Sequence, residues 1–462
     1  MRSAALTGPI DAEATAHLLR SDGQEDIAFG LWRPSTGAER ITALVQELIM
    51  PGPGDRRVHG NVSFEPQYLE RAMSTAAAKG AGLLMMHSHP QGRGWQGMSP
   101  DDVAAEQGNA AAVAGATGLP FLGMTLAGDR TWSARFWERT APRTYPVAWC
   151  RNVRVIGDAF RVSFNPDHYG PRKSQPRLVR TLSAWGDRTQ ASLVRLRVAV
   201  VGAGSVGGLV AEGLARMGFE HVDVFDFDDI EELNLDRLCY ATPSHVGDLK
   251  APVLARRLRE IATADNFEAE AIPAPIYDPR AFRRALDYDL LFSCVDRPWG
   301  RHVLNYIANV HVIPVVDGGI ATRRNRAGEL AGADWRAHVA APGRACLQCL
   351  GQYDAGLVQL EREGHLDDPT YIAALPEDHV LKARQNVFTF AMSCASFQLM
   401  QMLSMVVDPL GRANIGAQLY HFVGGELEPP NHPVCHEECL FPGLVAMGDH
   451  AGMVPTAKSE VA

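Results

Sequence analysis

Two histidines, an aspartate and a serine in the first part of the chain have the spacing of a metal-dependent hydrolase. His87 and His89 stand two residues apart, directly after the apolar run 81–86 that is typical of a buried strand. Alternate side chains of a strand point the same way, so both rings can direct a nitrogen at one ion. Ser99 and Asp102 suit the cap of a following helix. If that helix end lies against the histidines, Asp102 becomes a third ligand and Ser99 lies beside an open position; an ordinary cap and two structural histidines are the alternative interpretation.

A glycine-rich turn in the second half of the chain suits a nucleotide. Gly202, Gly204 and Gly207 follow the apolar run 197–201 and open a helical pattern. Glycines there let the backbone approach a phosphate at a helix N-terminus, and Asp226, at the end of the next predicted strand, suits ribose hydroxyls. On these features alone, an NAD-dependent dehydrogenase is the first interpretation.

Four of the eight cysteines form two closely spaced pairs. The pairs are Cys346 with Cys349 and Cys435 with Cys439, and the other four cysteines are single. This pattern favours a metal site with reduced thiols over a disulfide framework.

The elements that must position these residues divide the chain into two α/β domains. A chain of 462 residues exceeds the size at which one core keeps growing. We expect a first domain over 1–150, a linker over 151–176, a second domain over 177–446 and a flexible tail over 447–462. The expected strands are 26–32, 41–45, 81–86, 121–126 and 131–137 in the first domain, and 197–201, 222–225, 290–293 and 311–316 in the second. The expected helices include 11–20, 64–79, 101–115 and 178–191. Alternation of strand and helix in the second domain predicts a doubly wound parallel sheet.

Charge and hydropathy exclude some classes of partner. The formal net charge is -9 without a long basic block, so we expect no nucleic-acid partner. No stretch approaches 18 uninterrupted apolar residues, and residues 1–14 lack the apolar core of a secretion signal. We therefore expect no membrane span and a cytoplasmic location.

The residues at 87–90 and 99–102, His-x-His-Pro and then Ser-x-x-Asp, resemble the JAMM (MPN+) metalloproteases, a family of deubiquitinating enzymes. The resemblance covers about residues 10–140 and implies a cytidine-deaminase-like α/β domain. It also implies a catalytic zinc ion and names its ligands: His87, His89 and Asp102.

The same resemblance implies a general base and an oxyanion donor. Glu25 precedes a strand that runs into glycine, as the family's catalytic glutamate does, whereas Glu47 lies on a later strand and fits less well. Glu25 would take a proton from the attacking water, and Ser99 would donate to the developing oxyanion.

The run from Asp226 to Arg237, followed by Lys250, resembles the ubiquitin-activating and ThiF/MoeB-type adenylyltransferases. That resemblance implies that the site binds ATP and Mg²⁺ rather than NAD. The resemblance implies that Asp226 holds the ribose of ATP and that Asp228, in the same run, is a further residue of the nucleotide site. The residues implied to contact the phosphates are Asn234, Arg237 and Lys250.

Three further features belong to the adenylyltransferase resemblance. Asp296 matches the aspartate that helps to hold magnesium, and Arg180 resembles an arginine that reaches into a partner subunit's site, which implies a homodimer. The two cysteine pairs resemble a structural zinc knot of four thiolates. Because three residues rather than two separate Cys435 from Cys439, His432 or His436 is an alternative fourth ligand.

Together the two motifs indicate a bacterial-type fusion enzyme that acts on a small ubiquitin-like protein. One domain would adenylate the partner's C-terminal glycine, and the other would process the partner or cleave its conjugates, with a conjugating enzyme as a further partner. Processing and activation of a sulfur carrier is an alternative pathway, and a scaffold with an inactive peptidase is another. Cys394 lies in an apolar helical run, so we predict that no obligatory thioester forms on it.

Overall fold

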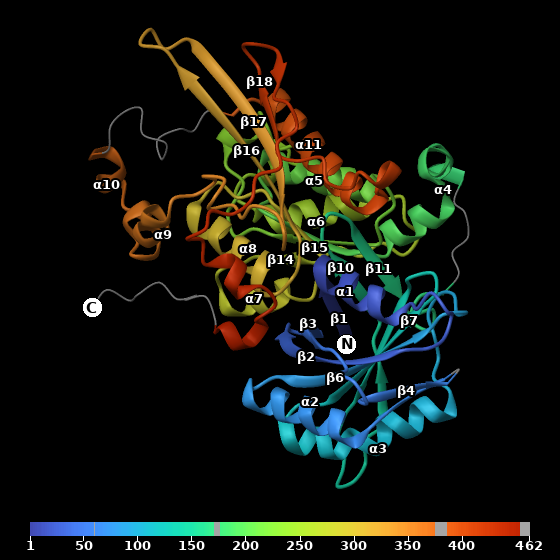
Figure 1. Ribbon diagram of the computed structural model, residues 1–462. Helices are drawn as coiled ribbons and strands as arrows, with labels where there is room; N and C mark the ends of the chain where they lie inside the picture. The colour runs from blue at the N-terminus through green and yellow to red at the C-terminus, as the bar shows by residue number, and fades with distance from the viewer. Residues whose placement is uncertain (60, 171–175, 375–385, 453–462) are drawn as a thin grey trace. The chain divides into compact units, whose positions relative to one another are not determined.

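The computed structural model describes residues 1–59, 61–170, 176–374 and 386–452 (Figure 1). Their contacts define two compact units. The first unit comprises Met1–Pro171, Val310–Val312 and Leu444–Gly452, and the second comprises Arg172–Asn309 and Ile313–Gly443, with the last ten residues outside the described ranges.

A nine-stranded mixed sheet forms the centre of the first unit. Its strand order is β11-β10-β1-β3-β2-β6-β7-β8-β9, and a separate hairpin joins β4 to β5. β6 pairs antiparallel with β2 and parallel with β7, so its C-terminal end is held on both sides. The strands are β1 (Arg2–Thr7), β2 (Ile27–Thr36), β3 (Ile41–Ile49), β4 (Arg56–His59), β5 (Asn61–Phe64), β6 (Gly82–His89), β7 (Phe121–Ala127), β8 (Trp132–Trp137), β9 (Val147–Trp149), β10 (Asn152–Ile156) and β11 (Phe160–Phe164).

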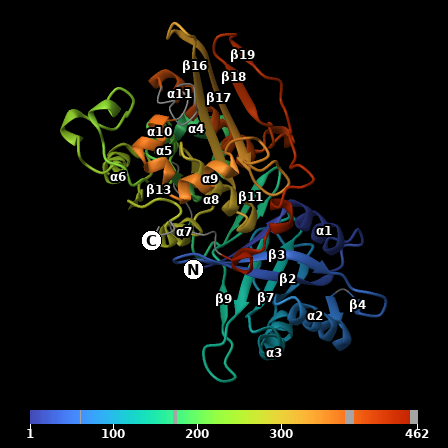
Figure 2. The same cartoon turned by 90° about the vertical axis from the view of Figure 1, so that its left-hand side faces the viewer.

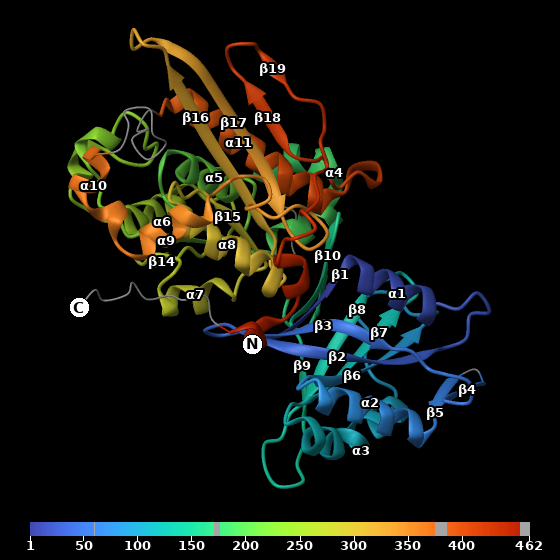
Figure 3. The ribbon, with the colours of Figure 1, turned by 60° about the vertical axis from the view of Figure 1, so that its left-hand side comes forward.

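Helices cover both faces of this sheet. α1 (Gly8–Leu18) packs on one face, over a core that includes Trp32 and Met86, and α2 (Pro66–Ala78) and α3 (Pro100–Thr117) pack on the other (Figure 3). Because side chains alternate along β6, His87 and His89 lie on the face of Met85, the side that α2 and α3 cover.

An eight-stranded sheet forms the second unit. Its order is β14-β13-β12-β15-β16-β17-β18-β19; the first five strands are parallel and the last three extend the sheet as an antiparallel meander, whose strands lie side by side in Figure 2. The strands are β12 (Arg197–Val201), β13 (His221–Phe225), β14 (Ala271–Ile272), β15 (Leu290–Ser293), β16 (Val315–Arg324), β17 (Leu330–Ala340), β18 (Gln418–His421) and β19 (Glu426–Leu427). The chain order runs outward in both directions from β12 and β15, which places the switch point of the doubly wound sheet between these two strands.

The helices of the second unit complete the α/β layers. They are α4 (Val179–Val194), α5 (Ser205–Arg216), α6 (Lys250–Ile261), α7 (Pro279–Ala285), α8 (Pro298–Val310), α9 (Ala355–Arg362), α10 (Pro369–Ala374) and α11 (Phe388–Val407). α11 is long and apolar enough to cross a membrane by length and composition alone, which the sequence did not lead us to expect. Half of its apolar window is buried, and it contacts α5, β16 and β17, as the core helix of a domain does.

The expected linker and tail boundaries are wrong where the structure describes them. Within 151–176, β10 pairs with β1 and β11 pairs with β10, so the first half of the expected linker completes the first sheet. Residues 444–452, placed at the end of the second domain and in the tail, belong to the first unit. Both segments are short and polar in part, and long-range strand pairing and packing order them. Residues 171–175 and 453–462 lie outside the described residues.

Candidate functional site

Three potential metal ligands meet at the C-terminal end of β6. His87 Nε2 lies 3.2 Å from His89 Nε2, and the carboxylate of Asp102 lies 3.3 Å from the former and 3.5 Å from the latter. One ligand atom from each residue lies within 4.8 Å of the other two. Strand β6 supplies the two rings, and the first turn of α3 supplies the carboxylate.

The chemistry of these three groups fits zinc. Two imidazole nitrogens and one carboxylate oxygen are a zinc donor set that leaves a fourth position open. His87 Nδ1 is buried and has no hydrogen-bond partner among the described residues. Although burial opposes it, hydrogen bonding to His87 and His89 holds the pKa of Asp102 well below its usual range, which keeps this carboxylate ionised.

Ser99 caps α3 and leaves its hydroxyl proton available. Ser99 Oγ accepts a hydrogen bond from the Asp102 N–H, and the Asp102 carboxylate accepts one from the Ser99 N–H. Because the hydroxyl oxygen only accepts in this capping box, its O–H can donate to another group. The cap and the metal cluster therefore coexist on the same residues.

Glu25 lies within electrostatic range of the cluster. Its carboxyl is partly buried just before β2, and burial raises its pKa while His89 and His87 act in the opposite direction. A raised pKa suits a group that accepts and returns a proton. Glu47, the weaker alternative, instead forms a surface ion pair with Lys79 at 2.7 Å.

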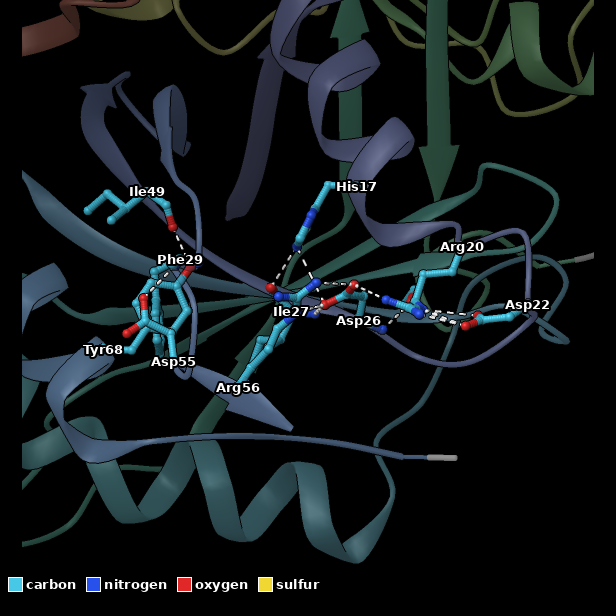
Figure 4. A network of polar contacts seen from close by, with 12 residues as sticks. His17, Arg20, Asp22, Asp26, Ile27, Phe29, Ile49, Asp55, Arg56 and Tyr68 are labelled. Atoms are coloured by element: carbon cyan, nitrogen blue, oxygen red, sulfur yellow. Dashed lines mark hydrogen bonds and ion pairs between the residues drawn. The ribbon is translucent and has the colours of Figure 1, made fainter. Parts of the chain in front are cut away.

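The sequence reasoning missed Asp26, a buried carboxylate beside Glu25 (Figure 4). Arg56 and Arg20 form ion pairs with it. Its backbone N–H donates to Ser88 Oγ at 3.0 Å, and its backbone C=O accepts from the Ser88 N–H at 3.1 Å. Since Ser88 separates the two histidines, this double contact fixes the segment that carries Glu25 against the strand that carries the ligands.

In the second unit, the glycine turn lies at the switch point of the sheet. Gly202 has φ +99°, a conformation that favours glycine. A Cβ atom on Gly202 would lie 2.5 Å from the C=O oxygen of Cys294, and one on Gly207 would lie 1.8 Å from that of Gly202. Gly204 is the N-cap residue of α5. Gly202 and Gly207 pack too closely for side chains, and the turn presents the N-terminus of α5, an arrangement that binds phosphates.

Asp226, Asp228 and Lys250 gather beside this turn. The Asp226 carboxylate accepts from the Ala203 N–H at 2.6 Å and from the Asp228 N–H at 2.9 Å. Lys250 Nζ lies 2.8 Å from Asp228 Oδ2. Burial raises the pKa of Asp226 to about 6, and Lys250 partly offsets this. Tyr240 Oη donates to the Ala203 C=O, a contact with no signal in the sequence.

The other adenylation residues are less closely joined. The side-chain oxygen of Asn234 accepts from the Glu231 N–H at 3.1 Å, and Arg237 pairs with the neighbouring Asp236. Asp296 is exposed in the loop between β15 and α8, where a carboxylate suits Mg²⁺. Arg180 is exposed at the start of α4, and the described contacts do not join it to the glycine turn.

The four paired cysteines form a second cluster. Their sulfur atoms all lie within 4.8 Å of one another, and Cys346 Sγ lies 3.7 Å from Cys439 Sγ. Backbone N–H groups point at the sulfurs: that of Cys346 at Cys435 Sγ, and that of His436 at Cys349 Sγ. Four thiols and N–H···S contacts fit a structural zinc ion, with Cys435 as the fourth ligand and the backbone of His436 in a supporting position.

A family comparison matches the second unit. The model of the ThiF family matches residues 177–425, more than half of the chain. The chain belongs to the ThiF family. This match covers the glycine turn and the residues around it, and it does not extend to residues 1–176.

Curated relatives resemble part of this ThiF-family chain. It is 31% identical over 138 residues to the adenylyltransferase and sulfurtransferase UBA4 of Meyerozyma guilliermondii, covering 30% of this chain and 32% of that protein. It is 32% identical to ubiquitin-like modifier-activating enzyme 5 of Drosophila willistoni, covering 27% and 33%. It is 33% identical to the sulfur carrier protein adenylyltransferase of Thermus thermophilus, covering 29% and 49%. The chain thus spans between a third and a half of the length of these relatives.

Solved structures superpose only loosely on the ThiF-family chain. The crystal structure of E. coli MccB with ATP superposes with a TM-score of 0.42 at 17% identity, covering 58% of this chain and 75% of that one. Likeness at this level supports no statement about residues or ligands.

Proposed function

We propose that the second unit is an ATP-dependent adenylyltransferase that activates the C-terminal glycine of a ubiquitin-like or sulfur-carrier protein. The carboxylate of that glycine attacks the α-phosphorus of ATP, an acyl-phosphate bond forms, and pyrophosphate leaves. The observation that carries the proposal is the grouping of Asp226, Asp228 and Lys250 beside a glycine turn at the switch point. The names of two relatives, ubiquitin-like modifier-activating enzyme 5 and sulfur carrier protein adenylyltransferase, supply the class of substrate.

The residues around the turn have separate tasks in this reaction. The glycine turn and the N-terminus of α5 bind phosphates, and Asp226 accepts hydrogen bonds from ribose hydroxyls. Lys250, Arg237 and Asn234 would contact the phosphates. Magnesium held at Asp296 would neutralise phosphate charge, which the approach of an anionic carboxylate requires. Arg180 would act in the site of a second copy, which makes a homodimer part of the proposal.

Adenylation is tested by mass spectrometry after incubation with ATP and a panel of ubiquitin-like proteins that end in glycine. We expect an AMP adduct on at least one of them and its loss in Lys250→Ala and Asp296→Ala. Calorimetry that shows binding of NAD but not ATP would overturn the proposal in favour of a dehydrogenase. A sulfur-transferring partner that consumes the adenylate would place the chain in sulfur-carrier metabolism, and a conjugating enzyme that consumes it would favour protein modification.

We further propose that the first unit is a zinc-dependent peptidase of the JAMM type. The convergence of His87, His89 and Asp102 beside Glu25 carries this second function. Zinc at these ligands would polarise a scissile carbonyl and make water a better nucleophile. Glu25 would accept a proton from that water and return it to the leaving amine, and the Ser99 hydroxyl would donate to the carbonyl oxygen.

The peptidase is tested with the same partner carrying a C-terminal extension or an isopeptide-linked lysine. We expect cleavage after the partner's terminal glycine, and its loss in Glu25→Gln and His89→Ala. Glu47→Gln is the matched control, because Glu47 lies in a surface pair and should leave cleavage unchanged. A wild-type chain that binds no zinc at the first site would favour a scaffold over an enzyme.

A further inference from the structure

A buried ion cluster in the second unit carries more positive than negative charge. Asp317 is fully buried on β16. Its carboxylate lies 3.3 Å from Arg301 Nε and 2.7 Å from Arg336 Nη1, and Ser293 Oγ donates to it at 2.6 Å. Two guanidinium groups therefore share one carboxylate, although one cation would neutralise it. A surplus positive charge on partly buried side chains favours a bound anion.

Parts of both guanidinium groups remain available to such an anion. Arg301 Nη2 makes a 3.3 Å contact with the Gly318 C=O. Arg336 Nε and Nη2 have no hydrogen-bond partner among the described residues, and neither atom is closed off from solvent. The side chains of Arg301 and Arg336 are 14% and 21% exposed, enough for a ligand to reach them. Guanidinium N–H groups that are not used within the protein suit a carboxylate ligand.

A glycine leaves space between the two groups. Gly319 pairs with Arg336 across β16 and β17. A methyl group placed on Gly319 would lie 3.0 Å from Arg336 Nη2 and 3.4 Å from Arg301 Nη2. A side chain at position 319 would therefore crowd both nitrogens, and glycine leaves them open to a ligand that packs over its Cα.

This point lies close to the glycine turn. Val201, Ser293 and Asp317 lie side by side on adjacent strands β12, β15 and β16. Strands are about 4.8 Å apart, so roughly 10 Å separates Asp317 from the end of the strand that enters the turn. Arg301 lies in the first turn of α8, which begins two residues after Asp296. The surplus cations therefore lie near the same strand ends as the proposed magnesium residue.

We propose that Arg301 and Arg336 bind the C-terminal carboxylate of the partner protein over Gly319. This inference rests on the proposed adenylation and adds the residues that hold the nucleophile. The two guanidinium groups offset the repulsion between an incoming carboxylate and the phosphates of ATP. Asp317 and Ser293 act as positioning residues, because they fix the guanidinium groups without reaching the ligand.

The test measures binding of a heptapeptide that ends in Gly-Gly, as the free acid and as the C-terminal amide, to the full chain by calorimetry. We expect the acid to bind and the amide to bind at least about tenfold more weakly. Gly319→Ala fills the space without removing a charge and should lower the affinity for the free-acid peptide by a similar factor. Arg336→Met should lower it as well. The affinity for ATP should stay within about twofold of the wild type, because neither residue touches the glycine turn.

Gly332→Ala is the matched control. It lies on the same β16–β17 hairpin, and its added methyl would meet only the flexible end of Arg323. Equal affinity for acid and amide, no binding of the acid at millimolar concentration, or unchanged binding in Gly319→Ala would overturn the inference. Binding of the acid that depends on Gly319, without any adenylate formed, would leave the carboxylate site intact and refute the proposed adenylation instead.

Discussion

Ser99 and Asp102 exchange two hydrogen bonds, and the same Asp102 carboxylate faces His87 and His89. The Ser99 N–H donates to Asp102 Oδ2 at 2.7 Å, and the Asp102 N–H donates to Ser99 Oγ at 3.1 Å. The helix cap therefore positions the metal ligand, and the stability of the first turn of α3 is coupled to the geometry of the metal site.

Removal of the cap should destabilise the first unit by a modest amount. We expect Ser99→Ala to lower the free energy of unfolding by about 1 kcal/mol, because the Asp102 N–H loses its acceptor. Chemical denaturation of the metal-free chain measures this difference. Ser99→Thr keeps a capping hydroxyl, so its free energy of unfolding should fall by less than that of Ser99→Ala. An equal decrease in the two variants would contradict the capping role.

Zinc content should separate the two metal sites. We expect two zinc ions per chain in the wild type, and one in either His89→Ala or Cys439→Ser, because each variant removes a ligand from a different cluster. Elemental mass spectrometry of the purified chain gives the ratio. His436→Ala should retain two ions, since only its backbone N–H approaches the cysteine cluster; a loss in that variant would make its ring the fourth ligand.

The sequence predicts the strands that carry apolar runs, and it misses those that do not. Residues 197–201 were expected as a strand and form β12 with the same bounds, because a valine-rich run ends at a glycine turn. β1 was not expected, although it lies inside the first sheet between β10 and β3. Its sequence, Arg-Ser-Ala-Ala-Leu-Thr, has few β-branched residues, so long-range pairing rather than local preference forms it.

The candidate sites follow the same division. Residues with local spacing, such as His87 with His89, could be chosen from the sequence. Buried charged groups could not, because their partners are distant along the chain: Arg336 stands 19 residues from Asp317, and Arg135 stands 29 residues from Glu106, its fully buried partner. A charged residue in the core contradicts the hydrophobic pattern, and only the fold shows what neutralises it.

The affinity for ATP should fall in mildly acidic solution. Asp226 must be ionised to accept hydrogen bonds from ribose hydroxyls, and burial raises its pKa to about 6. The carboxylate is therefore charged above this pH and becomes protonated below it. We expect ATP to bind about tenfold more weakly at pH 5 than at pH 7.5 because of this group. Calorimetry across this range measures the effect.

The titration of ATP itself must be separated from that of Asp226. Asp226→Asn cannot ionise, so it should bind ATP more weakly at neutral pH and lose less affinity on acidification. The difference between the two profiles isolates the aspartate. Parallel profiles for the wild type and the variant would show that Asp226 does not contact the nucleotide.

Cys394 should not carry the partner as a thioester. Its side chain is fully buried in α11, where Sγ contacts the backbone oxygens of Gly319 and Arg336 at 3.9 Å and 3.7 Å. Burial raises the pKa of this thiol to about 12, so almost none of it is a thiolate at neutral pH. We expect Cys394→Ala to form the adenylate as the wild type does, since a small apolar side chain replaces a packed thiol.

The measurement is mass spectrometry of the wild type and Cys394→Ala after incubation with ATP and a partner protein that the wild type adenylates, without reducing agent. Cys394→Ser is the matched control for packing, because it keeps the volume and introduces a poorer leaving group. A covalent adduct on the wild type that thiols remove, and that is absent in Cys394→Ala and resistant to thiols in Cys394→Ser, would make Cys394 the catalytic cysteine. The absence of any such adduct, with the adenylate retained in all three proteins, is the result that the buried position leads us to expect. The activated glycine would then pass to a nucleophile of a partner molecule or to a hydroxyl of this chain.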